Sequence, residues 1–339
     1  MPQIKVTPSM ALDAICYFDQ RLLNNAKRFK PKQLEFIEKV TAECADKLDN
    51  TCIGMSTLCM ILTAYADNTP FESLNLNGLA QLFKNPEDIR TVVKSRITNE
   101  FTASYVFPML DALVDGWAEK YVNKIKVLEK AGFEQMWETD ILPLVQKDIS
   151  LKNEVYSDIN VDNILKDIEK LKQCAPLSDI KIYVSYLSYP VAFTLHNGSF
   201  LENAGGVGSV GMLCHELMHG FSTEKLEMLY LNYVKNDTYL TEQHERLINE
   251  MSSGNEEEFV MAAEYYLRMK HNGEDKPKLL KEARKRYRGC VPISVLLFDM
   301  LSKEIETPNG YAEWLANLFE KQKLPQNNIQ CYLDEIAPK

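Results

Sequence analysis

The sequence lacks the features that mark several common classes of protein. Its eight cysteines contain no C-x-x-C pair and are too sparse for a disulfide scaffold, so we interpret them as reduced thiols. No stretch reaches the roughly 18 uninterrupted apolar residues of a membrane-spanning helix. The N-terminus has neither a long apolar run nor a small-residue cleavage site. We therefore expect a soluble, cytoplasmic protein with no membrane partner.

Positive charge is also in deficit. The chain carries 38 Lys and Arg against 48 Asp and Glu, a formal net charge of -10. A general nucleic-acid binder needs a surplus of cations to displace counterions, so we expect no nucleic-acid partner. Aromatic residues make up 10% of the chain, whereas glycine and proline number only 14 each, and this composition excludes a disordered or fibrous chain. The 45% of hydrophobic residues in 339 suffice for one large domain or two ordinary ones.

What the chain does contain is a series of helical patterns followed by one strand-like segment. Apolar residues recur at spacings of three and four from residue 9 to about residue 175. From Ile180 the stretch IKIYVSYLSYPVAFTL is rich in β-branched and aromatic residues, and Pro190 divides it into two strands or a bent edge strand. The sequence thus predicts an α+β, predominantly α-helical fold: a helical N-terminal region (1–175) precedes a catalytic region with a small sheet (176–339).

Two short motifs meet in GGVGSVGMLCHELMH, which runs from Gly205 to His219. The stretch from Gly206 to Gly211 fits G-x-G-x-x-G, the loop that holds a dinucleotide pyrophosphate. That loop requires a further strand after its helix. The segment that follows here, FSTEKLEMLYLNYVKNDTYL, has only a weak strand candidate and reads mainly as Tyr-rich turns. We therefore interpret the glycines as a sharp turn into a helix that begins around Ser209, and a nucleotide-binding enzyme as the least supported function.

The second motif, His215-Glu-Leu-Met-His219, fits H-E-x-x-H, a zinc site on a helix. Histidines at i and i+4 project from the same helical face and can reach one ion. Glu216 lies about 100° further round and flanks the open coordination position, where it can take a proton from water. The metzincin extension H-x-x-G-x-x-H is excluded, because Ser222 and Lys225 occupy its Gly and His positions.

A catalytic zinc ion takes three protein ligands, so a third ligand has to come from elsewhere. The best-supported source is NEEEFVMAAEYYL, a helix expected from about Asn255. Glu257 projects from the inner edge of its apolar stripe and is our choice, with Glu258 and Glu250 as alternatives. Glu264 lies seven residues on and shares that face, where it can hold the second ring nitrogen of a histidine ligand.

On these residues the sequence resembles the gluzincin peptidases, the thermolysin-like zinc enzymes, over about residues 180–270. His215, Glu216 and His219 match the family's H-E-x-x-H residue for residue. The resemblance implies a zincin-like module with a small sheet, whose edge strand receives an extended substrate. It further implies a zinc-dependent peptidase with one Zn²⁺ on His215, His219 and Glu257, a peptide or protein substrate, and Glu216 as general base for a metal-activated water.

The sequence departs from the gluzincin pattern in two respects. The gap from His219 to Glu257 is longer than in thermolysin-like members, and no G-A-M-E-N-type signature supports an exopeptidase. The alternative function is therefore a catalytically inactive binding or regulatory protein on the zincin scaffold, with a structural or lost metal.

A peptidase also needs a hydrogen-bond donor for the developing oxyanion. The candidates for this role are Tyr265, Tyr266, Tyr287, Arg288 and His244, and the sequence does not decide among them.

Overall fold

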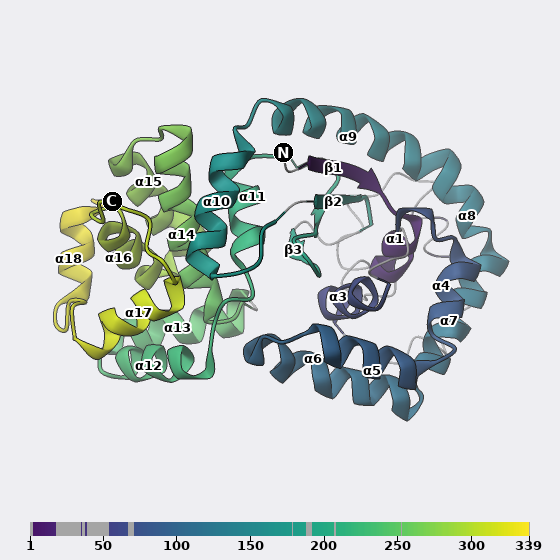
Figure 1. The fold of residues 1–339 in the computed structure, drawn as a ribbon, viewed down its shortest axis with the longest axis horizontal. Coiled ribbons are helices and arrows are strands. Elements are labelled where there is room, and N and C mark those ends of the chain that lie inside the picture. Colours follow the sequence, from purple (N-terminus) through teal and green to yellow (C-terminus); the bar gives the residue numbers. More distant parts are fainter. Residues whose placement is uncertain are drawn as a thin grey trace.

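The fold is predominantly helical around one small sheet (Figure 1). The structure, a computed structural model, describes residues 3–17, 35, 38, 54–66, 71–177, 179–187, 192–206, 208–251 and 253–338. The predicted α+β class is confirmed. A helix expected in QLEFIEKVTAECADKL, residues 33–48, lies largely outside the described residues.

The sheet combines one strand from the start of the chain with three from its middle. In spatial order its strands are β1 (Gln3–Pro8), β2 (Asp179–Ser185), β4 (Phe200–Asn203) and β3 (Phe193–Thr194). The first three run parallel, and β3 is the edge strand, antiparallel to β4. The prediction of a purely helical region over 1–175 missed β1, because a single short strand carries little periodic signal and forms only against β2.

A tight turn connects β3 to β4. The turn signal His196-Asn-Gly198 lies between the two strands, and Asn197 and Gly198 both take positive φ values, of 52° and 68°. Two such residues in succession match the twist of an antiparallel hairpin. The strand-like segment therefore holds two strands, β2 and β3, which is one of the two arrangements predicted, and β4 follows after the turn.

The N-terminal helices surround one side of the sheet (Figure 1). They are α1 (Met10–Tyr17), α3 (Met55–Tyr65), α4 (Leu76–Leu82), α5 (Pro86–Arg96), α6 (Glu100–Ala112), α7 (Ala118–Ala131), α8 (Phe133–Met136) and α9 (Leu142–Ser157), and they are followed by α10 (Val161–Lys172), which lies beside α11. Helix α9 packs along β1 and β2, whereas α10 packs against helices of the C-terminal half. The two halves are therefore joined through both the sheet and α10.

The C-terminal half is helical after the sheet. Its helices are α11 (Val210–Met218), α12 (Glu224–Lys235), α13 (Thr238–Met251), α14 (Glu256–Asn272), α15 (Lys276–Lys285), α16 (Pro292–Leu301), α17 (Tyr311–Glu320) and α18 (Ile329–Ile336). The largest packing interfaces of α14 are with α11 and α16. No helix in the described part of the chain is long and apolar enough to cross a membrane.

The prediction of Tyr-rich turns after the zinc motif was wrong, because α12 and α13 occupy that segment. Thr223 caps α12 by accepting a hydrogen bond from the backbone N–H of Leu226. Leu226, Tyr230, Tyr233 and Val234 are buried on one face of α12. Their spacing of four, seven and eight residues is helical, so the tyrosines pack in the core.

Candidate metal centre

The glycine-rich stretch is the turn that carries the chain from β4 into α11. Ser209 caps α11 by accepting a hydrogen bond of 3.0 Å from the backbone N–H of Met212. Gly205 has a φ of +90°, a conformation that side chains disfavour. A Cβ atom on Gly208 would lie 2.9 Å from the ring of Tyr156. These glycines are thus required by the turn and by close packing, as the sequence predicted.

Helix α11 presents the zinc motif at its C-terminal end. His215 and Glu216 lie within the helix, whereas His219 is the residue after it, with extended backbone (ψ 154°). The two imidazole rings nevertheless remain neighbours, with centroids 5.1 Å apart. The ammonium group of Lys172, on α10, donates hydrogen bonds to the carbonyls of Leu217 (2.9 Å) and His219 (2.5 Å). This cation stabilises the end of α11 and fixes where His219 leaves it.

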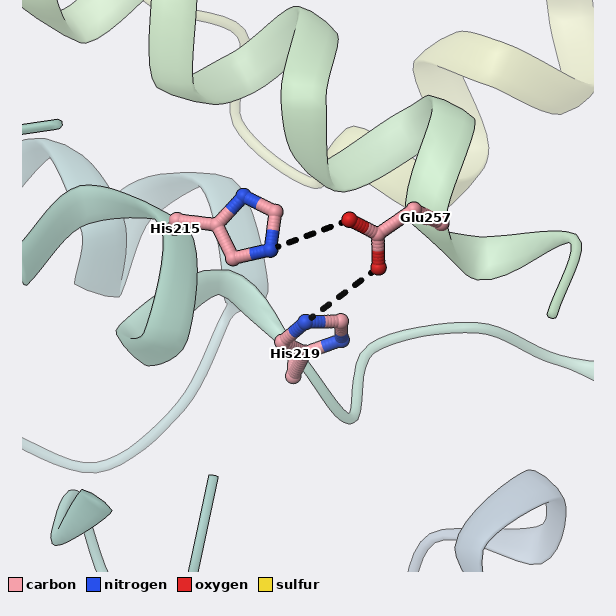
Figure 2. Close-up of side chains that lie close together, drawn as sticks. All are labelled: His215, His219 and Glu257. Carbon is pink, nitrogen blue, oxygen red and sulfur yellow. Dashed lines mark ion pairs between the residues drawn. The ribbon is translucent and has the colours of Figure 1, made fainter. Parts of the chain in front are cut away.

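Glu257, in the first turn of α14, faces both histidines (Figure 2). One carboxylate oxygen lies 3.3 Å from Nε2 of His215, and the other lies 3.9 Å from Nε2 of His219. Among the described residues these three form the group whose ligand atoms lie within 4.8 Å of one another and could hold a metal ion. The structure therefore brings together the three residues that were chosen from the sequence.

The other nitrogen of each imidazole is held by a second carboxylate. Nδ1 of His215 lies 3.0 Å from Glu264, as the sequence suggested, and Nδ1 of His219 lies 3.2 Å from Glu256. Glu264 is held in turn by Arg268 at 3.1 Å. Carboxylates in this position orient metal-binding histidines and fix their tautomers, so that Nε2 points to the ion.

Glu256 was not assigned a role from the sequence. Besides His219, it accepts hydrogen bonds from the backbone N–H groups of Gly220, Phe221 and Ser222, at 3.0 to 3.1 Å. It therefore fixes the segment immediately after His219. The sequence could have suggested a role for Glu256 only through its position directly before Glu257, because its partners at residues 219–222 lie more than 30 residues away in the chain.

The two alternative third ligands have other roles. Glu258 is buried, accepting hydrogen bonds from the Tyr230 hydroxyl (2.8 Å) and from the backbone N–H groups of Ile293 (2.6 Å) and Ser294 (3.0 Å). It thereby caps the start of α16. Glu250 is exposed on α13, where it pairs with Arg246. Neither carboxylate belongs to the histidine cluster.

Glu216 is oriented by the edge strand of the sheet. The hydroxyl of Thr194, on β3, donates to the carboxylate of Glu216 at 3.0 Å and lies 2.7 Å from its carbonyl oxygen. Burial raises the pKa of Glu216, while the neighbouring charges of His215 and His219 oppose this rise. A buried carboxylate with a raised pKa is suited to accept and return a proton.

Charges in the cluster are strongly coupled. Burial opposes ionisation of Glu257, yet His215, His219 and the Tyr287 hydroxyl lower its pKa to about 2. Burial likewise disfavours the charged form of His215, but Glu257 and Glu264 raise its pKa well above its ordinary value. Binding of a divalent cation at this point would release the imidazole protons, because histidine binds metals in its neutral form.

Tyr287, one of the five candidate oxyanion donors, contacts the cluster. Its hydroxyl donates a hydrogen bond of 2.8 Å to Glu257. Tyr287, Arg288 and Gly289 have φ values of 47°, 55° and 80°, three successive left-handed residues. Non-glycine residues held in this conformation store strain, which is often found at functional sites.

Three of the other donor candidates have different surroundings. The Tyr266 hydroxyl contacts Thr307 at 3.1 Å, and the Nδ1 atom of His244 contacts the Tyr230 hydroxyl at 3.3 Å. Tyr265 is fully buried, with its ring against Phe298. The fifth candidate, Arg288, has an exposed side chain.

A cavity of about 270 Å³ lies behind His215, on the Glu264 side. Its lining includes His215, Glu264, Arg268 and Arg286, but neither Glu216 nor the other two cluster residues. The cavity therefore adjoins the carboxylate that orients the histidine, not the point where the ligand atoms converge.

The donor set fits a zinc ion. Two donors each about 2.1 Å from a tetrahedral zinc lie roughly 3.4 Å apart. One oxygen of Glu257 lies 3.3 Å from Nε2 of His215, close to that value, and its other oxygen lies somewhat further, 3.9 Å, from Nε2 of His219. Two imidazoles and one carboxylate are also the ligands of many catalytic zinc sites, which leave the fourth position to water.

Comparisons of the chain with protein-family models, with curated proteins and with solved structures found no match.

Proposed function

We propose that the protein is a zinc-dependent peptidase of the gluzincin type, with one Zn²⁺ on His215, His219 and Glu257. The observation that carries this proposal is the convergence of these three side chains, with both imidazole Nε2 atoms facing the Glu257 carboxylate (Figure 2). Each histidine is backed by its own buried carboxylate, an arrangement typical of metal sites.

We infer further that the sheet, α11 and α14 form a zincin-like module. Three features support this inference. The antiparallel edge strand β3 lies beside the motif helix, Thr194 of that strand contacts Glu216, and α14 packs directly against α11. An extended peptide can add to the edge of β3 that no described strand covers, through backbone hydrogen bonds, which would bring its carbonyl groups alongside Glu216.

Each residue of the centre then has a chemical role. A bound zinc ion lowers the pKa of a water molecule and polarises a carbonyl group. The carboxylate of Glu216 accepts the proton of the attacking water and transfers it to the leaving amine. The hydroxyl of Tyr287 donates a hydrogen bond to the negative charge that develops on the carbonyl oxygen.

The test combines metal analysis with peptide cleavage. Protein purified without a histidine tag should contain one zinc per chain and cut peptides from a mixed library, and a chelator should stop the cleavage. Glu216→Gln should retain zinc while hydrolysis is lost. Bound zinc without cleavage of any peptide would instead favour the inactive scaffold, and cleavage that survives Glu216→Gln would contradict the mechanism.

A further inference from the structure

The N-terminal helix α6 is tied to the metal centre by a chain of hydrogen bonds. Asn99 caps α6 by accepting a hydrogen bond from the Thr102 N–H, and its side-chain amide donates to the carbonyl of Ser222 at 3.1 Å. The N–H of Ser222 donates to Glu256, whose other oxygen holds Nδ1 of His219. The start of α6 is therefore fixed beside the segment that follows the second histidine.

Helices α6 and α3 together carry a partly exposed apolar cluster. The ring of Tyr105 packs edge-on against Phe101, with centroids 5.9 Å apart, and its hydroxyl contacts the sulfur of Met60 at 3.9 Å. Tyr105 is nevertheless 39% exposed, one of few large hydrophobic side chains so exposed among the described residues. We call Tyr105, Phe101 and Met60 the aromatic cluster.

Two observations place the aromatic cluster close to the catalytic groups on the His219 side. Thr102, one turn before Tyr105, lies with its hydroxyl 3.8 Å from the position that a Cβ atom on Gly220 would occupy. Burial raises the pKa of Tyr105, and the charge of Glu256 raises it further. The hydroxyl of Tyr105 thus lies in a crowded region near Glu256, although part of its side chain remains open to water.

One of the helices that carry the cluster packs against the edge strand of the sheet. Met60 lies on α3, which packs against both α6 and the edge strand β3, as Figure 1 shows. Thr194 of β3 orients Glu216. The helices that carry the aromatic cluster therefore both pack beside the metal centre: α6 against the segment after His219, and α3 against the edge strand.

We propose that the aromatic cluster is the subsite that selects the substrate: it takes a large apolar side chain, preferably aromatic, of an extended peptide lying on β3. This inference rests on the proposed function and names its substrate class. Aromatic side chains pair favourably edge-to-face, and the Met60 sulfur adds a contact that aromatic rings favour. An apolar side chain of the substrate at this point would cover the part of Tyr105 that water otherwise contacts.

The experiment compares peptides that differ at one residue. Starting from any peptide that the protein cuts, the residues near the cut are changed in turn to Phe, Leu, Ala or Glu. At one position, kcat/KM for Phe should exceed that for Ala by about tenfold or more, the discrimination that an apolar pocket provides. The ratio should fall towards one in Tyr105→Ala and be retained in Tyr105→Phe, which keeps the ring.

Leu151→Ala provides the matched control, because this leucine is 53% exposed on α9 and takes no part in the cluster. The Phe-to-Ala ratio should not change in this variant. Circular dichroism of all three variants checks that they are folded. A wild-type ratio near one at every position, or a ratio that survives Tyr105→Ala, overturns the assignment of the subsite and leaves the proposed peptidase intact.

Failure of the peptidase itself is recognised separately. If zinc-loaded wild-type protein cuts no peptide, the proposed function falls, and binding of fluorescent peptides to the Glu216→Gln variant then tests the cluster. Tighter binding of a Phe-containing peptide than of its Ala counterpart, lost in the double variant with Tyr105→Ala, supports the subsite. Equal binding of the two peptides overturns it.

Discussion

The hydroxyl of Tyr287 donates a 2.8 Å hydrogen bond to Glu257, which joins a strained turn to the carboxylate facing both histidines. Because this hydroxyl contacts the ligand cluster directly, we expect Tyr287→Phe to lower kcat by roughly 100- to 1,000-fold, as loss of an oxyanion donor does. KM should change little, and kcat is measured with saturating zinc, because the same hydroxyl also supports the ligand Glu257. Tyr266→Phe is the control, since its hydroxyl contacts Thr307 and should leave kcat unchanged. Equal losses in both variants would contradict the assignment.

The three glutamates considered as third ligand should separate in a zinc titration. Glu257→Gln should weaken zinc binding by at least about 100-fold, because even outer residues of zinc sites contribute 10- to 100-fold. Glu250→Gln should bind zinc like the wild type. Glu258→Gln should retain zinc but lower the free energy of unfolding by about 1–3 kcal/mol, since its buried partners lose an acceptor. Thermal unfolding with and without zinc reports both the zinc affinity and the stability of each variant. An unchanged zinc affinity in Glu257→Gln would exclude Glu257 as a ligand.

The carboxylate behind His215 should matter for the metal without touching it. Replacing Glu264 by Gln leaves the size of the side chain unchanged but weakens its hold on Nδ1, so zinc affinity should fall by about 10- to 100-fold. Competition with a chromogenic chelator measures this change. Glu274→Gln, which alters another carboxylate partner of Arg268, serves as the comparison and should have a smaller effect.

Stability should depend on pH through a buried carboxyl group far from the metal centre. Burial raises the pKa of Asp13 from 3.8 to about 6, although Ser185, Trp137 and Leu187 donate hydrogen bonds to it. The folded state thus binds a proton more tightly than the unfolded state. Its contribution to stability is fully present below about pH 4 and is lost as the pH rises through 6.

The size of this effect follows from the shift in pKa. A pKa of Asp13 that is about two higher in the folded than in the unfolded state corresponds to about 3 kcal/mol of stability. Chemical denaturation of wild type and Asp13→Asn between pH 4 and pH 7 measures it: the difference in stability between the two proteins should move in favour of the variant as the pH rises. A difference that is constant over this range would contradict the raised pKa.

A glycine should tolerate a methyl group only where the structure leaves space for it, and Gly208 of the glycine turn and Gly254 before α14 differ in this respect. A Cβ atom on Gly208 would meet the buried ring of Tyr156 at 2.9 Å, so Gly208→Ala should destabilise the protein by about 1–3 kcal/mol. At Gly254 a Cβ atom meets nothing within 4 Å, and Gly254→Ala should be close to neutral. Urea denaturation of both variants checks this, and neutral behaviour of Gly208→Ala would show that the packing there is loose.

Local patterns in the sequence were sufficient for several features of the fold. The helix that begins the zinc motif, its start around Ser209 and the glycine turn before it were predicted correctly, because spacing and turn chemistry act between residues close in the chain. The segment at α12 was misread, since its tyrosines were taken as turn residues although their spacing is helical. Strand β1 was missed because its partner lies more than 170 residues away.

The sequence by itself determined that His215 and Glu216 lie on one short helix with His219 close beside His215, since that depends on spacing along the chain, although α11 ends at Met218. Tertiary structure alone decided what each of three consecutive glutamates does: Glu256 fixes the chain after His219, Glu257 faces both imidazoles, and Glu258 caps α16. Successive residues of α14 point about 100° apart, so each meets a different distant segment, and those segments are brought there only by packing.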